Sequence, residues 1–358
     1  MLFRSAMLHI SAEFLSLSGE PAVLVKQDRI IFVNSAAESI LGSGCIGRSP
    51  GMVFGAELAG THSSSFICDI MINGVGYVAR VTSADNMKAI FFSRSEFPAA
   101  LLSDAFVYSI RNRLMSFAVA ADIACQRAES LGDEEMLASI AAMTQEYFRA
   151  RRSVSNISVI RGVHDKSIYP SVSRFDLHEM ISGLTDILSS LISDVSISLS
   201  DGPPISVTGD SALIEQLVLN LISNAITHAH GRTHIVVGIR ETGSHAIISV
   251  SDDGCGIPPD KLHLVFERYR HGYDMSNIGA GAGFGLTVAR SIAQLHGGTL
   301  LLESRQGVGT TVRVSLSHEC SFAAFGEPGT QWTPSISPVL IGLADCLDTK
   351  YFSEKFTD

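Results

Sequence analysis

The first hundred residues alternate apolar and polar positions in the way that short β-strands do. The predicted strands cover residues 22–25, 29–33, 65–72, 76–82 and 88–93. After the second strand, residues 35–42 predict a short helix, with Asn34 or Ser35 as its N-cap and Gly42 at its end. The pattern therefore predicts a small α+β module over residues 1–97.

After Pro98 the hydrophobic spacing changes to three and four residues, which predicts long amphipathic helices. The stripe of the first helix comprises Leu102, Phe106, Ile110, Leu114, Phe117, Ala121, Ala124, Ala128 and Leu131. Gly132-Asp133 interrupts the pattern, and a second stripe runs from Leu137 to Ile157. Two long helices joined by a tight turn predict an antiparallel hairpin over residues 98–165. Because a lone hairpin leaves its stripe uncovered, we expect a homodimer held by a four-helix bundle.

From Phe175 to Leu316 the predicted helices and strands are mixed, as in a layered α/β domain. The predicted helices cover residues 177–193, 211–229 and 286–295. The predicted strands cover residues 195–199, 205–208, 235–240, 246–251, 299–303 and 310–315. We place this domain at residues 166–318. The tail over residues 319–358 shows no periodicity before 339–346, and the sequence predicts no role for it.

The chain has 358 residues, with 26 Lys and Arg against 36 Asp and Glu, and a formal net charge of −10. This acidic balance without a basic block argues against nucleic acid as the main partner. No run of about 18 apolar residues predicts a membrane span, and residues 1–16 lack a signal-peptide core. The six cysteines form no CxxC pair, which is typical of reduced thiols. We therefore expect a cytoplasmic, multidomain α+β protein.

Motifs that suit a nucleotide occur in a fixed order in the predicted α/β domain. Asn220 and Asn224 are four residues apart, so their amides lie on one helix face. In Asp252-Asp253-Gly254-Cys255-Gly256, directly after a strand, the glycines let the backbone approach a flat ligand. The carboxylate beside them can accept from an exocyclic amine. The run from Gly279 to Leu286 leads into a helix, where backbone N–H groups can converge on phosphates.

These motifs, in this order and spacing, resemble the N, G1 and G2 boxes of GHKL ATPases, and more narrowly those of sensor histidine kinases. Phe266-Glu267-Arg268-Tyr269 takes the place of the F box, and Gly307-Val308-Gly309-Thr310 that of the G3 box. The resemblance covers residues 175–316. It implies an α/β sandwich that binds ATP and Mg²⁺ beneath a lid formed by residues 270–280.

The resemblance also implies roles for individual residues. Asp252 would bind the adenine amine, Asn224 would hold Mg²⁺ against the phosphates, and Asn220 would be a second nucleotide-side amide. The implied ATP-binding residues are Asn220, Asn224, His228, Asp252, Gly254, Gly256, Gly279, Gly281, Gly283, Phe284, Gly285, Leu286 and Thr310. Thr227 stands where family members often carry a lysine, so one phosphate contact would be absent.

The N-terminal module resembles a PAS domain in its element order and in the run Ile-Ile-Phe-Val-Asn-Ser-Ala-Ala-Glu at residues 30–38. Another small α+β domain is the alternative. The PAS resemblance implies a sensor for a small-molecule or protein signal. The histidine kinase resemblance implies that the receiver domain of a response regulator is a partner.

The first hairpin helix departs from the family at the phosphate-accepting position. Family members carry His-Glu-Leu-Arg-(Thr/Asn)-Pro-Leu there, whereas this chain has Tyr108-Ser109-Ile110-Arg111-Asn112-Arg113-Leu114. An imidazole attacks a phosphate readily near neutral pH, whereas a phenol needs a base to activate it. Asn112 keeps the polar residue that the family associates with positioning water to dephosphorylate the regulator. Helical spacing predicts that Tyr108 points away from the bundle core.

Three functions of different classes follow from this departure. The chain is a phosphotransferase with an unusual acceptor at Tyr108, a regulator phosphatase acting through Asn112 with nucleotide as an effector, or a non-catalytic scaffold. Other GHKL enzymes, such as anti-sigma-factor serine kinases and topoisomerase-type ATPases, normally lack this arrangement of a PAS-like module and a hairpin.

Two further groups of basic residues stand out in the sequence. We expect a solvated face of the second helix to be formed by Arg149, Arg151 and Arg152. His-x-His spacing can bind a metal ion, and an alternative metal site would use His228, His230 and His234.

Overall fold

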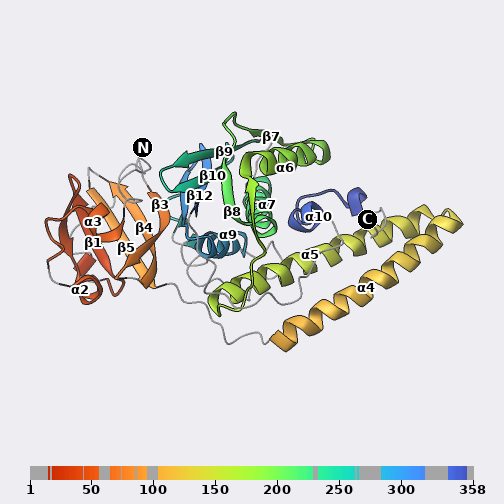
Figure 1. The fold of residues 1–358 in the computed structure, drawn as a ribbon, viewed down its shortest axis with the longest axis horizontal. Coiled ribbons are helices and arrows are strands. Elements are labelled where there is room, and N and C mark those ends of the chain that lie inside the picture. The colour runs from red at the N-terminus through yellow and green to blue at the C-terminus, as the bar shows by residue number, and fades with distance from the viewer. Residues whose placement is uncertain are drawn as a thin grey trace, which may run out of the picture.

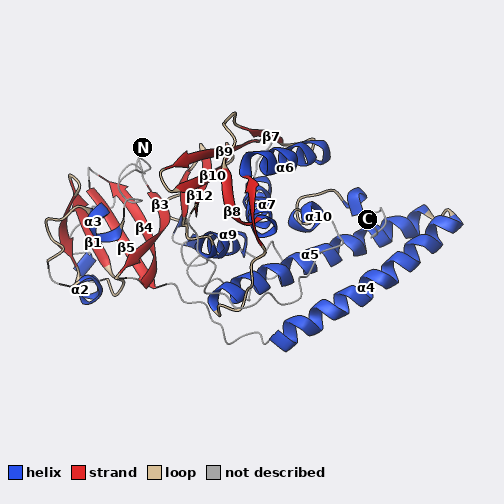
Figure 2. Ribbon diagram, in the orientation of Figure 1, coloured by secondary structure: helices blue, strands red, loops and turns tan. Residues whose placement is uncertain are grey.

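The computed structural model of the chain describes residues 15–16, 18–42, 44–55, 65–73, 75–84, 87–94, 104–228, 233–262, 264–265, 284–318 and 338–352. They form an N-terminal module, a helical hairpin and a C-terminal α/β domain, which lie side by side in Figure 1. Figure 2 shows strands in the first and third of these parts, and helices in the hairpin. The mixed α+β class predicted from the sequence is confirmed.

The N-terminal module is an antiparallel sheet with short helices beside it. Its elements are β1 (Ala22–Lys26), β2 (Arg29–Val33), α2 (Ser35–Leu41), α3 (Pro50–Phe54), β3 (Ser65–Ile72), β4 (Val75–Ala84) and β5 (Met87–Arg94). Asn34 begins α2, because its Oδ1 accepts from the N–H groups of Ala37 and Ala22, each at 2.9 Å. This buried amide therefore ties the helix to the first strand. The strands and the helix lie where the sequence predicts them, whereas α3 was not predicted.

The hairpin is amphipathic and leaves one apolar face exposed. Its helices are α4 (Asp104–Leu131) and α5 (Glu134–His164). Gly132 follows α4 with a φ of +65°, and Asp133 caps α5 by accepting from the N–H of Met136 at 3.0 Å. The exposed large side chains of the hairpin are Tyr108, Met115, Val119, Ile123, Leu131, Met136 and Met143. Elsewhere on α5, Tyr147 and Phe148 are buried in the core shared with the α/β domain.

In the α/β domain, helices α6, α7 and α9 pack with the strands around one apolar core. Its elements are β6 (Val172–Asp176), α6 (Leu177–Leu191), β7 (Ser196–Leu199), β8 (Ser206–Asp210), α7 (Ser211–Thr227), β9 (His234–Thr242), β10 (His245–Asp252), α9 (Phe284–Leu295), β11 (Leu300–Arg305) and β12 (Gly309–Ser317). Asp210 begins α7 by accepting from the N–H of Leu213 at 3.1 Å. The buried His296 accepts from the N–H of Asp210 at 3.0 Å, and burial lowers the pKa of His296. This contact joins the ends of α7 and α9.

The N-terminal module and the α/β domain share one sheet. β3 pairs with β11, with Cys68 opposite Leu301 and Ile67 opposite Leu302. The resulting ten-stranded sheet has the order β2-β1-β5-β4-β3-β11-β12-β10-β9-β7, and β6 and β8 form a separate pair. Next to this junction, Asp69 of β3 forms a buried ion pair with Arg290 of α9. The sequence predicts strands in both parts but not their pairing.

The C-terminal segment, residues 338–352, packs against both α5 and α7 (Figure 1). It contains α10 (Pro338–Gly342) and the 3-10 helix η4 (Thr349–Phe352). Its buried side chains are Val339, Leu343, Ala344, Leu347 and Phe352. Gly342 lies on Leu219 of α7 so closely that an added Cβ would be 2.8 Å from the Cβ of Leu219.

The part of the chain that the structure describes contains no helix both long and apolar enough to cross a membrane.

Candidate functional site

A cavity of 340 Å³ opens where α7, β10, β12 and the start of α9 meet. The residues of the predicted nucleotide site that line it are Asn224, His228, Asp252, Gly256, Phe284, Gly285, Leu286 and Thr310. Its apolar walls include Leu221, Val250, Ile257, Leu302 and Val312. Apolar walls with a few convergent polar groups are typical of a small-molecule site.

At one end of the cavity, Asn224 of α7 faces the first turn of α9. A Cβ added to Gly285 would lie 2.8 Å from Asn224 Nδ2 and 2.9 Å from its Oδ1. A side chain at this position would therefore displace the Asn224 amide from where it lies. An amide oxygen is a suitable Mg²⁺ ligand, and the start of a helix of this length suits a phosphate. This end of the cavity therefore fits a metal-bound polyphosphate.

Asp252 ends β10 inside the same cavity. Its Oδ1 accepts from the N–H of Gly254 at 3.0 Å and from the N–H of Thr310 at 3.3 Å. Burial raises the pKa of the Asp252 carboxyl, and these two N–H groups oppose the shift. Gly256 has a φ of +61°, and a Cβ there would lie 2.1 Å from the carbonyl oxygen of Arg305. The turn after β10 thus requires this glycine, and it leaves Asp252 Oδ2 available to a ligand.

Other predicted site residues lie elsewhere. Asn220 is 2% exposed and does not line this cavity; its Oδ1 accepts from Arg152 Nη2 at 3.1 Å. Gly254 is buried behind the cavity and serves as a donor to Asp252. The remaining predicted positions lie outside the described residues: Gly279, Gly281, Gly283, the F-box run 266–269, the lid 270–280 and His230. Among the residues that are described, no cluster of three or more His, Cys, Asp or Glu could hold a metal ion.

The prediction that the arginines of α5 form a solvated face is wrong for two of them. Arg151 and Arg152 are each 8% exposed. The guanidinium of Arg151 lies over the ring of Tyr147, with 5.7 Å between its Cζ and the ring centroid. Arg152 lines the nucleotide-type cavity next to Asn224. The α/β domain and the C-terminal segment cover this part of α5, and neither contact is visible in the helical spacing.

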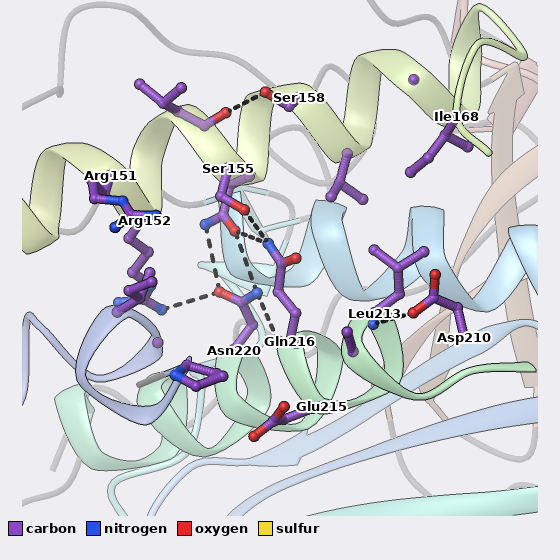
Figure 3. A pocket seen from close by; sticks show the side chains of 18 of the residues that line it. Arg151, Arg152, Ser155, Ser158, Ile168, Asp210, Leu213, Glu215, Gln216 and Asn220 are labelled. Carbon is purple, nitrogen blue, oxygen red and sulfur yellow. Dashed lines mark hydrogen bonds between the residues drawn. The ribbon is translucent and has the colours of Figure 1, made fainter. Parts of the chain in front are cut away.

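A second cavity of 530 Å³ lies between the hairpin and α7 (Figure 3). Polar side chains line it beside Asn220: Gln216 Nε2 donates to Asn156 Oδ1 at 2.9 Å, and Glu215 lies one residue before Gln216. Burial raises the pKa of the Glu215 carboxyl.

The substitution Glu215→Gln should stabilise the chain at neutral pH. Because the folded-state pKa of Glu215 is raised, the folded chain binds this proton more readily than the unfolded chain does. The ionised carboxylate therefore destabilises the fold above both pKa values, and the effect disappears below them. We expect the Tm to rise by about 1–3 °C at pH 7 and by less at pH 4. Thermal unfolding at both pH values measures this, and a lower Tm of the variant at pH 7 would contradict it.

On α4, the acceptor position and the amide one turn later are both accessible. Tyr108 is 64% exposed and Asn112 is also exposed. Ser109, also exposed, follows Tyr108 and carries no carboxylate. His164 lies at the far end of α5 and contacts Asp165 at 2.9 Å. Tyr108 therefore points away from α5, and its direction relative to the core of a four-helix bundle stays a prediction.

Residues 209–319 match the family model described as histidine kinase-, DNA gyrase B- and HSP90-like ATPase. Sensor histidine kinase ZraS of Klebsiella oxytoca is 33% identical over 214 residues, which cover 58% of this chain and 44% of that protein. Histidine protein kinase DivJ of Caulobacter vibrioides is 37% identical over 116 residues, or 32% of this chain and 19% of that protein. The chain thus spans less than half the length of these curated relatives.

Among solved structures, the mycobacterial sensor histidine kinase MprB is 27% identical with a TM-score of 0.34, and the alignment covers 42% of this chain and 99% of that chain. The ATPase match covers α7, β10, β12 and the start of α9, which line most of the 340 Å³ cavity. It shows that residues 209–319 belong to the histidine kinase-, DNA gyrase B- and HSP90-like ATPase family, and the curated relatives that match this chain are sensor histidine kinases.

Proposed function

We propose that the chain is a two-component signalling protein that binds Mg-ATP and acts on the receiver domain of a response regulator. The observation that carries this proposal is the 340 Å³ cavity, which brings together Asn224, Asp252, Gly285 and Thr310. Asp252 would hold the adenine amine, and Asn224 would hold Mg²⁺ near the start of α9. Bound nucleotide would supply a phosphoryl group or shift the balance between conformations.

The three parts of the chain would then have separate roles. Residues 1–97 would form a PAS-like sensor, residues 98–165 would dimerise, and residues 166–318 would bind nucleotide. The exposed apolar side chains of α4, such as Val119 and Ile123, support the dimer, because a second copy would bury them in a four-helix bundle.

We propose further that the chain dephosphorylates its regulator and does not phosphorylate itself. Tyr108 and Asn112 are both exposed one turn apart in the first three turns of α4, before Val119 and Ile123. A dimer that buries the later positions would leave this first part of the helix accessible to a receiver domain. A positioned amide can orient a water molecule for attack on an acyl phosphate. A phenol without an activating base is a poor phosphate acceptor, and Ser109 supplies no carboxylate beside it.

The test combines phosphate transfer with regulator dephosphorylation. Purified chain incubated with γ-labelled ATP and Mg²⁺ should gain no label, and Tyr108→Phe should behave identically. Receiver domains from the source genome, phosphorylated with acetyl phosphate, should lose phosphate in the presence of the chain. Asn112→Ala should slow this loss about a hundredfold, the size expected when a group that positions a reactant is lost.

Gln126→Ala is the matched control, because Gln126 is an exposed amide on the same helix that contacts only Asp122 among the described side chains. Dephosphorylation at the wild-type rate by Asn112→Ala would exclude the phosphatase function and leave the scaffold. An acid-stable label that is lost in Tyr108→Phe would instead identify a tyrosine acceptor. An acid-labile, base-stable label would identify a histidine acceptor elsewhere in the chain.

A further inference from the structure

A buried arginine and an aspartate from distant parts of the sequence meet at the rim of the nucleotide-type cavity. Arg152 of α5 donates from Nη1 to Asp345 Oδ2 at 2.5 Å, and from Nη2 to Asn220 Oδ1 at 3.1 Å. Figure 3 shows the second of these bonds. Both Arg152 and Asp345 line the same cavity as Asn224. Cys346, the residue after Asp345, contacts Ser223 and Thr227 on either side of Asn224 in the sequence. The pair therefore lies on the α7 side of the cavity, where Asn224 is.

The Arg152 side chain retains an unused donor. It is 10% exposed, and its Nε is buried without a hydrogen-bond partner among the described groups. Among the described residues that line the cavity, Arg152 is the one Arg or Lys, and Thr227 brings no charge. A guanidinium is the side chain best suited to bind phosphate oxygens through paired N–H groups. Among the described lining residues, Arg152 is thus the strongest phosphate ligand, and the Asp345 carboxylate already pairs with it.

Asp345 is held in place by the C-terminal segment. Gln145 of α5 donates from Nε2 to the carbonyl oxygens of Ala344 at 3.2 Å and Leu347 at 2.9 Å. On the other side, Cys346 Sγ lies 3.2 Å from the hydroxyl of Ser223, the residue before Asn224. The family match ends at residue 319, so this segment lies outside the matched ATPase domain. A segment beyond that domain therefore places a carboxylate where the cavity would meet phosphate.

We propose that Arg152 is a phosphate-binding residue of the nucleotide site and that Asp345 competes with the nucleotide's phosphates for it. This inference rests on the proposed binding of Mg-ATP in this cavity. Nucleotide binding would transfer the guanidinium from Asp345 to phosphate oxygens and loosen the C-terminal segment. The hairpin thereby contributes directly to nucleotide affinity, and the segment lowers that affinity.

The test compares ligands that differ only in phosphate. Isothermal titration of the full chain with Mg-ATP and with adenosine measures the phosphate-dependent part of the affinity. Asp345→Asn should tighten Mg-ATP binding about tenfold and leave adenosine within twofold. Arg152→Ala should weaken Mg-ATP binding about tenfold and also leave adenosine within twofold.

The double variant separates competition for Arg152 from a general effect of negative charge. In an Arg152→Ala background, Asp345→Asn should no longer change Mg-ATP affinity, because Arg149, the other arginine that pairs with Asp345, does not line the cavity. If Asp345→Asn still increases Mg-ATP affinity in this background, the proposal is overturned, because the increase would then come from removing a negative charge and not from freeing Arg152. Gln145→Ala, which leaves both charges in place but releases the segment, should tighten Mg-ATP binding in the same direction as Asp345→Asn.

Asp348→Asn is the matched control, because Asp348 lies in the same segment but is exposed and faces Lys350 at 3.9 Å. It should leave the affinities for both ligands unchanged. If the wild type binds Mg-ATP and neither Asp345→Asn nor Arg152→Ala changes the affinity, this inference is overturned and the proposed function stands. Absence of binding of either ligand by every variant would overturn both.

Discussion

Asp69→Ala is expected to lower the free energy of unfolding by about 3–5 kcal/mol, because it leaves a buried guanidinium without its carboxylate. Asp69 Oδ1 accepts from Arg290 Nε at 2.6 Å, and the two side chains are 6% and 5% exposed. Asp69 Oδ2 also accepts from the N–H of Leu300 at 3.3 Å, at the start of β11. One carboxylate thus binds both α9 and the first residue of β11, the strand that pairs with β3.

The matched comparison removes both charges together. In Asp69→Ala with Arg290→Met, no unpaired ion is left in the core, so the double variant should be more stable than either single variant. Because a chain with several parts need not unfold in one step, amide hydrogen exchange in β3 and β11 should accompany denaturant unfolding. Exposed ion pairs contribute about 1 kcal/mol or less. If Asp69→Ala lowers the free energy of unfolding by no more than that, β3 and β11 are not paired in solution.

The elements that the sequence predicts well are those whose signals are local. α7 and α9 have apolar stripes, and α7 also has a capping residue, Asp210, so their positions follow from spacing. β6 was missed because most of its side chains are exposed and show no alternation. The pairing of β3 with β11 joins residues more than two hundred positions apart. A strand's own pattern shows which face it buries but not which edge its partner will occupy.

The same distinction holds within the site. The sequence predicts Gly256 and Asp252 as lining residues, because a turn that needs a glycine and a carboxylate after a strand are visible in a few consecutive residues, and both line the cavity. Arg152 was misjudged, because on its own helix it is one of several charged residues at a typical surface spacing. Its burial depends on Asn220 and on Asp345, which come from α7 and from the C-terminal segment. No periodicity within α5 carries that information.

Asp252→Asn is expected to weaken adenine nucleotide binding about hundredfold, or about 3 kcal/mol. Asp252 Oδ1 is held by the N–H groups of Gly254 and Thr310. An asparagine that keeps its oxygen there would present its NH₂ group to the ligand in place of Oδ2. A donor would then face the donor of the adenine amine, and one buried polar group would lose its partner.

The same substitution should have the opposite effect on the free protein. Because burial raises the pKa of Asp252, the folded chain binds that proton more readily than the unfolded chain does, and the ionised carboxylate destabilises the fold above both pKa values. Asp252→Asn should therefore raise the Tm at pH 7 and lower nucleotide affinity. This combination is expected of a residue that serves ligand binding at a cost in stability.

The affinity of the wild type for adenine nucleotide should also fall as the pH drops through the pKa of Asp252. Because this pKa is raised, the fall should begin at a higher pH than it would for an ordinary aspartate. Asp253→Asn is the matched control for affinity at the upper end of the pH range, because the neighbouring Asp253 accepts from the N–H of His234 at 2.7 Å and does not line the cavity. Its charge contributes to the raised pKa of Asp252, so this variant should move the pH dependence of affinity to lower pH. Titration calorimetry of both variants between pH 4.5 and 8, a range of about one to four units above the usual aspartate pKa, measures the effect. Equal losses in the two variants would show that Asp252 acts on the turn after β10 and not on the nucleotide.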